Sequence, residues 1–313
     1  MPRFSVVIPL YNKASYIARS IDSVLKQEVD DFELLVVNDG STDGSEKIVV
    51  EYSDPRVRLI NQPNAGESAA RNTGISGSTS PYIAFLDADD SWDADFLKVI
   101  NKLTEEFPEA GAYAAHVRDP QSHRLQQFHV YDSTRVEESW MIENYFDCLN
   151  SGYYPVTSSS VCVKRSILIN INGFDESLKI GPDIDAWIRV FLNSGIALSN
   201  RYAATYHTDA ENRSVHRSDY VSRELEFFVH LRDRYLTESL DGRSRVALDE
   251  WTSSRIHQII IRCIYQGDKR FAARVLRGHW GDLRGRQRLV GLTRLCTPNA
   301  LVELLKGLGG REA

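Results

Sequence analysis

The sequence has few cysteines and no long apolar stretch, and both absences narrow the classes of protein that it encodes. Its four cysteines, Cys148, Cys162, Cys263 and Cys296, form no C-x-x-C pair. We expect buried thiols of a reducing compartment, and neither a disulfide framework nor a zinc site. No segment approaches the ~20 apolar residues that span a bilayer, and residues 1–4 lead into a strand pattern without an apolar signal core. We therefore expect a cytoplasmic protein, at most peripheral to the inner face of the membrane.

Three widespread catalytic motifs are also missing. The chain contains no G-x-x-x-x-G-K-[ST] loop, no G-x-G-x-x-G after a strand and no G-x-S-x-G elbow. These absences argue against P-loop, dinucleotide-binding and serine-hydrolase chemistry. The formal net charge of −6 argues against a general nucleic-acid binder, so we expect no nucleic-acid partner.

The charge is unevenly distributed along the chain. Residues 269–313 contain ten Lys or Arg and three Asp or Glu, a balance of +7, so the rest of the chain carries −13. A basic tail on an acidic body can contact an anionic membrane surface or an acidic partner. A solvated helical face is the alternative interpretation.

Strand and helix patterns alternate over the first third of the chain. Apolar runs at 4–10, 32–37, 57–60 and 82–86 predict buried strands, and helical patterns fill the gaps and continue over 92–107. This alternation predicts an α/β fold with a mostly parallel central sheet flanked by helices.

The second half of the chain changes character. Residues 111–205 give a mixed pattern with a strand at 158–163 and a helix at 184–192. Only helical patterns follow residue 215, at 222–236, 246–265, 271–277 and 299–308. We divide the chain into an α/β domain, residues 1–214, and a C-terminal all-helical extension, residues 215–313.

Polar clusters follow three of the predicted strands, at residues 9–12, 38–41 and 87–90. The carboxyl ends of parallel strands meet at one edge of a sheet, where ligands bind. Asp87 and Asp89 can address one ion, and their hard oxygens suit Mg²⁺ or Mn²⁺, which also bind phosphate oxygens. A solvated acidic turn is the alternative, but the buried strand before the pair favours a metal site.

Four segments resemble the family 2 glycosyltransferases, which have the GT-A fold. They occur in the family's order and spacing: FSVVIPLYN at 4–12, LVVNDGSTD at 35–43, NAGESAARNTG at 64–74 and FLDADD at 85–90. The likeness continues more weakly to about residue 214. It implies an inverting, metal-dependent transfer of a sugar from a nucleoside diphosphate, with UDP expected, to an acceptor hydroxyl. It also implies a role in bacterial polysaccharide or glycan synthesis.

The resemblance assigns the nucleobase side of the site. Pro9 and Tyr11 would line the base pocket, with Tyr11 stacked on the ring, although plain packing is the alternative for Tyr11. Asp39 would accept a hydrogen bond from the base, or simply belong to a turn. Arg71 would lie near the base and the acidic loop, or serve as a structural ion-pair partner of Asp39 or Asp87.

The resemblance also assigns the phosphate side. Asp87, with Ala88 beside it in the nucleotide-sugar-binding set, would hold the ribose or a metal-bound water. Asp89 would bind the Mn²⁺ or Mg²⁺ cofactor. His207 is a candidate for a further metal or phosphate contact, with a structural role as the alternative.

A base must take the acceptor's proton as its oxygen attacks the anomeric carbon. Residues 181–189, GPDIDAWIR, resemble the family's Gly-Glu-Asp segment before a Trp-bearing helix, and Asp183 falls where the base belongs. Pro182 replaces the usual Glu, which leaves the register open and makes Asp185 the rival. Pro182 also suits the first position of a helix, so helix capping by Asp183 is the other interpretation.

Two rival functions and the tail remain open. A sugar-nucleotide nucleotidyltransferase would need a Gly-rich loop where residues 9–12 stand, whereas a non-catalytic nucleotide-sugar-binding module is consistent with Pro182. The helical tail has apolar faces beside many arginines. It can pack on the catalytic domain, form a homodimer, lie on a membrane or recognise a glycan or lipid-linked acceptor.

Overall fold

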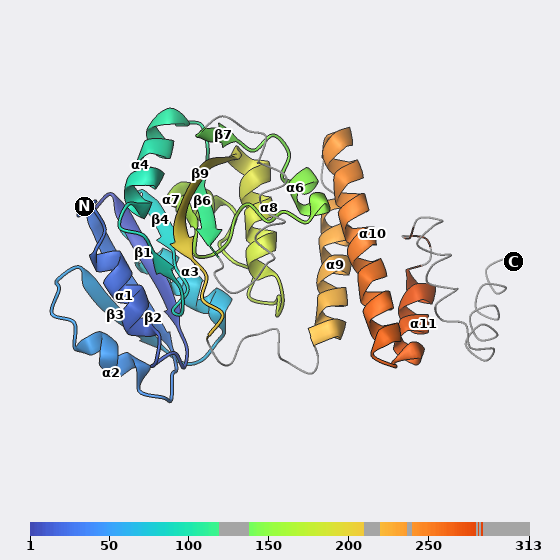
Figure 1. Cartoon of the computed structure of the whole chain (residues 1–313), viewed down its shortest axis with the longest axis horizontal. Helices are drawn as coiled ribbons and strands as arrows, with labels where there is room; N and C mark the ends of the chain where they lie inside the picture. The colour runs from blue at the N-terminus through green and yellow to red at the C-terminus, as the bar shows by residue number, and fades with distance from the viewer. Residues whose placement is uncertain (119–137, 210–219, 237–239, 280, 282, 284–313) are drawn as a thin grey trace, which may run out of the picture. The chain divides into compact units, whose positions relative to one another are not determined.

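The computed structural model describes residues 1–118, 138–209, 220–236, 240–279, 281 and 283, and it divides the chain into two units (Figure 1). The first unit is Met1–Arg213 and the second is Ser214–Ala313. The helix predicted at 299–308 and Cys296 lie outside the described residues.

The described part of the first unit contains one nine-stranded sheet, with eight strands in the order β3-β2-β1-β4-β8-β6-β9-β5 and β7 paired with β9. The strands are β1 Phe4–Leu10, β2 Phe32–Asp39, β3 Val57–Gln62, β4 Tyr82–Phe85, β5 Ser91–Trp92, β6 Ala112–Arg118, β7 Ser139–Met141, β8 Val161–Lys164 and β9 Ile196–Thr205. The helices are α1 Ile17–Leu25, α2 Ser45–Val50, α3 Glu67–Gly77, α4 Phe96–Glu106, α6 Tyr145–Ser151, α7 Arg165–Asn170 and α8 Pro182–Ser194.

The pairing pattern places most carboxyl ends at one edge of the sheet. Strand β1 pairs in parallel with both β2 and β4, and Val7 lies beside Leu35 and Phe85. Strand β8 is antiparallel to β4 and β6, and β9 is parallel to β6. Strands β1, β2, β4, β6 and β9 therefore all run in the same direction. The predicted α/β fold with a mostly parallel sheet is confirmed.

Helices cover both faces of this sheet because its central strands are buried on both sides. Val6 and Ile8 of β1 share a core cluster with the apolar faces of α1 and α4. Successive strand residues point to opposite faces, so Val7 faces the other way, and α3 packs on it at Gly74. Such two-sided burial explains the continuous apolar runs that mark these strands in the sequence.

The structure corrects one predicted boundary. Trp92 was expected to begin a helix, but it lies in strand β5, which pairs with β9, and α4 begins at Phe96. The Trp92 ring stacks on Phe96 at a centroid distance of 4.0 Å, and its indole N–H donates to the Ser159 carbonyl at 2.7 Å. These tertiary contacts override the helical period, which counts Trp92 as the first apolar position.

The second unit is helical throughout its described residues, with α9 Tyr220–Leu236, α10 Gly242–Tyr265 and α11 Lys269–Gly278. Helix α10 begins at an N-cap, Asp241, whose side chain accepts hydrogen bonds from the Arg243 and Ser244 N–H groups. Its apolar side buries Trp251, Ile256 and Ile259. Among the described residues, no helix is long and apolar enough to cross a membrane.

The close approach of α3 to β1 gives a testable prediction. A Cβ atom added at Gly74 would lie 2.3 Å from Val7 Cγ1, which is fully buried on a β-branched side chain. We expect Gly74→Ala to lower the free energy of unfolding by about 1–3 kcal/mol, the usual cost of overpacking. Urea denaturation measures this change.

Gly77→Ala is the matched control in the same helix. Its added Cβ would meet only the flexible end of Ile60, Cδ1, at 3.1 Å. If both variants unfold at the same urea concentration, the contact of α3 with Val7 does not restrict the side chain at position 74.

Candidate active site

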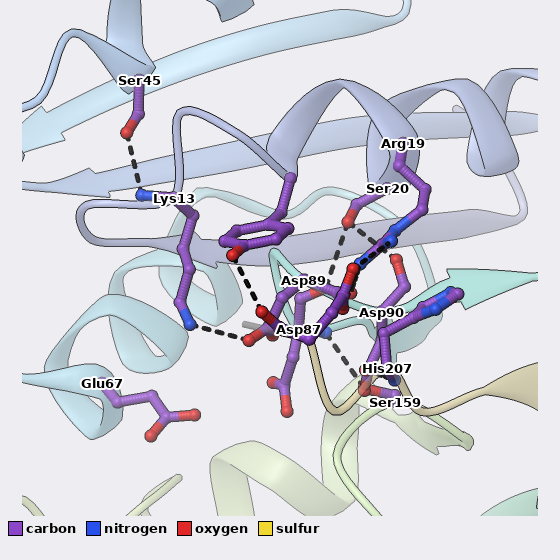
Figure 2. A network of polar contacts seen from close by, with 12 residues as sticks. Lys13, Arg19, Ser20, Ser45, Glu67, Asp87, Asp89, Asp90, Ser159 and His207 are labelled. Atoms are coloured by element: carbon purple, nitrogen blue, oxygen red, sulfur yellow. Dashed lines mark hydrogen bonds and ion pairs between the residues drawn. The ribbon is translucent and has the colours of Figure 1, made fainter. Parts of the chain in front are cut away.

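An acidic turn, Asp87–Asp90, follows β4 at the carboxyl edge of the sheet (Figure 2). The Asp90 N–H donates to the Asp87 carbonyl at 3.1 Å and closes the turn. Helix α1 holds it from one side, because Arg19 donates to the Asp89 carbonyl at 2.6 Å and Ser20 donates to the Asp90 carbonyl at 2.7 Å. The turn therefore presents its side chains from a fixed backbone.

Arg71 links α3 to this turn. Its guanidinium is 2 % exposed, donates to Asp87 Oδ1 at 2.8 Å and also pairs with Glu67. Burial raises the pKa of Asp87 to about 6, the negative charges of Glu67 and Asp89 add to the rise, and Arg71 opposes it. Of the two ion-pair partners considered for Arg71, Asp39 and Asp87, the structure shows Asp87.

Asp89 extends toward the first loop. Its Oδ2 accepts from Lys13 Nζ at 2.7 Å, and both side chains are largely buried. Lys13 follows β1 and Asp89 follows β4, so two loops of the rim meet at this ion pair, as the shared edge predicted. The ion pair of Lys13 with Asp89 was not predicted from the sequence, although Lys13 lies two positions after Tyr11.

The donor atoms here suit a metal that is shared with a substrate. Within the described part of the chain, no three His, Cys, Asp or Glu side chains form a group that could hold an ion by themselves. Mg²⁺ and Mn²⁺ are commonly held by one or two carboxylates together with phosphate oxygens. Asp89, with Asp87 beside it, fits such a cation if a diphosphate completes its coordination.

His207 follows β9 and lies next to the acidic turn (Figure 2). Its Nε2 is 2.9 Å from Ser91 Oγ, and its backbone N–H donates to Asp90 Oδ1 at 3.0 Å. Burial lowers the pKa of His207, and the charge of Arg19 adds to the shift. A neutral imidazole is the form that binds metal, so this environment is compatible with a ligand as well as with a structural residue.

The nucleobase candidates lie at the carboxyl ends of β1 and β2. Tyr11 is 48 % exposed at the end of β1, whereas Pro9 and Ala88 are buried. Asp39 is 2 % exposed, and its carboxylate accepts from Gln62 Nε2 at 2.7 Å. The same carboxylate accepts from the N–H groups of residues 65 and 66 at 2.9 Å each. Asp39 therefore shapes the loop before α3, a role the sequence did not indicate.

The candidate base lies at the start of α8. The helix begins at Pro182, two residues before the predicted start at 184, and Asp183 is in its first turn. Burial raises the pKa of Asp183, Asp87 contributes in the same direction, and Arg71 opposes the rise. These interactions place Asp183 within electrostatic range of the acidic turn.

The rival residue, Asp185, has a different environment. It is fully buried and accepts from Arg189 Nε at 2.8 Å. Arg189 also donates to the carbonyls of Ile171 and Gly173 at 2.6 and 2.7 Å. This network anchors the loop before α8, which favours a structural role for Asp185 and leaves Asp183 as the candidate base.

Comparisons with known proteins agree with this architecture. Residues 5–159 match the model of the family described as Glycosyl transferase family 2. The "Glycosyltransferase GlyA" of Streptococcus pneumoniae is 34 % identical over 187 residues, which are 58 % of this chain and 27 % of that protein. The "Uncharacterized glycosyltransferase EpsJ" of Bacillus subtilis is 42 % identical over 108 residues, 34 % of this chain and 30 % of that protein. The chain thus spans less than a third of the length of these two relatives.

Solved structures show the same fold. The structure of S. aureus TarS 1–349 in complex with UDP-GlcNAc has a TM-score of 0.70 at 16 % identity and covers 98 % of this chain and 91 % of that one. The mannosyltransferase PcManGT from Pyrobaculum calidifontis, in complex with GDP-Man and Mn²⁺, has a TM-score of 0.56 at 19 % identity, covering 99 % and 88 %. The chain has the GT-A fold, and its residues 5–159 match glycosyltransferase family 2.

The Arg71 ion pair should make the stability of the protein depend on pH. Arg71→Leu leaves Asp87 without its main counter-charge, and we expect it to lower the free energy of unfolding at pH 8 by about 3 kcal/mol. The folded pKa of Asp87 lies above its unfolded value and rises further without Arg71. Stability is therefore lost as pH rises through the folded pKa, so the penalty should be smaller at pH 5 than at pH 8.

Denaturant unfolding at both pH values measures the difference. Arg56→Leu is the control, because Arg56 pairs with Asp54 at 2.8 Å and the pKa of Asp54 is lowered. Its penalty should not change between pH 5 and pH 8. A pH-independent penalty for Arg71→Leu would refute the coupling to Asp87.

Proposed function

We propose that residues 1–214 form a catalytic domain that transfers a sugar from a UDP-sugar to an acceptor hydroxyl with inversion at the anomeric carbon. The observation that carries this proposal is the convergence of Asp87, Arg71 and the partly buried carboxyl of Asp183 at the edge of one sheet. The fold shared with TarS, whose structure is described as a complex with UDP-GlcNAc, supports a UDP-linked donor. The acceptor we propose is a glycan or lipid-linked saccharide, as in bacterial polysaccharide synthesis.

The donor would bind along the rim from Tyr11 to the acidic turn. Tyr11 would stack on the base, while Pro9, Asp39 and the loop before α3 shape its pocket. Asp89, with His207, would hold Mn²⁺ or Mg²⁺, and Asp87 with Ala88 would lie against the ribose. The cation, when bound, supplies positive charge beside the departing diphosphate.

Asp183 would act as the base. A carboxylate with a raised pKa removes a proton better than an exposed one, because its charged form is less stabilised by solvent. Burial provides that shift here, against the opposing charge of Arg71. A single base that activates the acceptor for direct attack implies one displacement and hence inversion.

The rival functions predict different products. A nucleotidyltransferase would release pyrophosphate from a nucleoside triphosphate, and a binding module would bind donor without turnover. The Arg189 ion pair gives Asp185 a structural role without catalysis, which supports Asp183 as the base of a transferase. We therefore favour the transferase.

A donor screen with Mn²⁺ tests the proposal. Purified chain is incubated with UDP-glucose, UDP-galactose, UDP-GlcNAc or GDP-mannose, and release of the nucleoside diphosphate is followed by chromatography. We expect release from at least one UDP-sugar, and loss of a general base should lower kcat by about 100-fold or more in Asp183→Asn. Donor affinity should be retained.

Asp185→Asn is the matched control for this variant. We expect a lower melting temperature, because it disrupts the buried Arg189 pair, but near-normal turnover by the folded protein. Full activity of Asp183→Asn together with loss in Asp185→Asn would reverse the assignment of the base. Release of pyrophosphate from a nucleoside triphosphate would favour the nucleotidyltransferase.

We also propose that the second unit contacts an anionic membrane surface. Helix α11 buries Ala272 and Leu276, whereas Arg270, Arg274 and Arg277 are exposed at positions i, i+4 and i+7. This spacing puts the three arginines on one side of the helix. The basic balance of residues 269–313 supports the same proposal.

Flotation with liposomes tests the membrane contact. Changing Arg270, Arg274 and Arg277 together to Gln should reduce binding to vesicles rich in phosphatidylglycerol by roughly two orders of magnitude, at about 1 kcal/mol per charge. Neutral phosphatidylcholine vesicles should bind neither protein. Equal flotation of both proteins refutes the proposal, and a concentration-dependent mass in light scattering would favour the homodimer instead.

A further inference from the structure

Two bridges hold the segment of residues 207–209 against the acidic turn. We infer that their central residues, Asp90 and Arg19, are positioning residues that set the spacing between Asp89 and His207. The inference rests on the proposed function, in which Asp89 and His207 share a cation. Neither Asp90 nor Arg19 need touch the cation or the substrate.

The inner bridge is the Asp90 carboxylate. Asp90 is 1 % exposed, and its two oxygens serve two different segments. Oδ1 accepts from the backbone N–H of His207 at 3.0 Å, and Oδ2 accepts from the hydroxyl of Ser159. The Ser159 hydroxyl in turn accepts from the Asp87 N–H at 3.2 Å. One buried carboxylate thus joins the ends of β4 and β9 to the chain before β8.

The outer bridge is the Arg19 guanidinium of α1 (Figure 2). It donates to the Asp89 carbonyl at 2.6 Å and to Asp209 Oδ2 at 3.3 Å. Tyr16, the N-cap residue of α1, donates its hydroxyl to the Asp209 carbonyl at 3.0 Å. The outer bridge therefore fastens the same two segments from the side of α1.

The bridges matter because the chain that connects Asp89 and His207 does not by itself hold these two candidate ligands at a set distance. Asp90 and His207 are 117 residues apart in sequence, and both Asp89 and His207 lie beyond the ends of strands. A metal site loses affinity when its ligands are poorly placed, and removal of outer partners typically costs 10–100-fold. Asp90 and Arg19 fix the backbone directly at Asp89 and at residues 207–209, so their loss should weaken cation binding more than nucleotide binding.

Calorimetric titration of the full chain with UDP, in Mn²⁺ and in EDTA, tests the inference. Asp90→Ala removes both acceptor oxygens, and we expect it to raise the Kd for UDP in Mn²⁺ by about tenfold or more while leaving the Kd in EDTA unchanged. Asp90→Asn retains one acceptor oxygen for the His207 N–H and should recover part of the loss. Arg19→Gln should weaken binding in Mn²⁺ to a smaller extent.

Arg201→Gln is the control. Arg201 lies on β9 and pairs with Asp95 before α4 at 2.9 Å, so it also joins β9 to the chain after β4 but does not contact the acidic turn. Its Kd values should match those of the wild type. Hydrogen exchange of the peptide containing His207 should be faster in Asp90→Ala than in Arg201→Gln.

The outcomes separate the inference from the proposed function. Wild-type protein that binds UDP no better in Mn²⁺ than in EDTA would refute the cation role and the inference with it. Mn²⁺-dependent binding that is unchanged in Asp90→Ala and Arg19→Gln would refute the inference alone. If Asp90→Ala does not fold, Arg19→Gln decides, because the Arg19 side chain is one-third exposed and its removal leaves the core intact.

Discussion

The buried guanidinium of Arg71 is the interaction on which the site depends. Burial disfavours every ionised carboxyl around it, and Asp87 in particular carries a raised pKa. Arg71 compensates by pairing with Asp87 and Glu67, while its guanidinium carbon lies 5.2 Å from the centre of the Phe174 ring. Without that central positive charge, the carboxyls that converge on the rim would repel one another. Several carboxyl groups can therefore lie together at one edge of the sheet, because Arg71 of α3 places a positive charge among them.

The remaining excess of negative charge gives the rim its chemical character. Lys13 offsets part of it at Asp89, and Arg19 contacts only the backbone of the turn there. A divalent cation accompanied by a diphosphate would satisfy the rest, because the phosphates supply the ligands that the protein lacks. Donor and cation would then bind as one unit, a natural arrangement for a transferase that must release the diphosphate afterwards.

The sequence indicated which edge of the sheet carries the polar loops, but it did not indicate which contacts their side chains make. The continuous apolar runs of β1, β2 and β4 predicted both the strands and the edge where their polar loops meet. The sequence pattern gave no bounds for strands β6 and β9, because their alanine-rich sequences have weak strand propensity. These two strands form because they are buried between neighbouring elements. Asp39 and Asp185 show the same limit at the level of residues. Their identity marked them as acids, but only packing determines that one shapes a loop and the other pairs with Arg189.

By itself, the sequence determined the succession of strands and helices in the first third of the chain, the family resemblance and the chemical types of side chain that follow the strands, since these depend on local patterns over residues 4–90. Only the tertiary structure decided which groups form hydrogen bonds or ion pairs with one another. The contacts of Asp90 with Ser159 and His207, and of Arg19 with Asp209, join segments that are 69 to 190 residues apart. Hydrogen bonds act over about 3 Å in space, and no spacing along the chain encodes which distant residues will come that close.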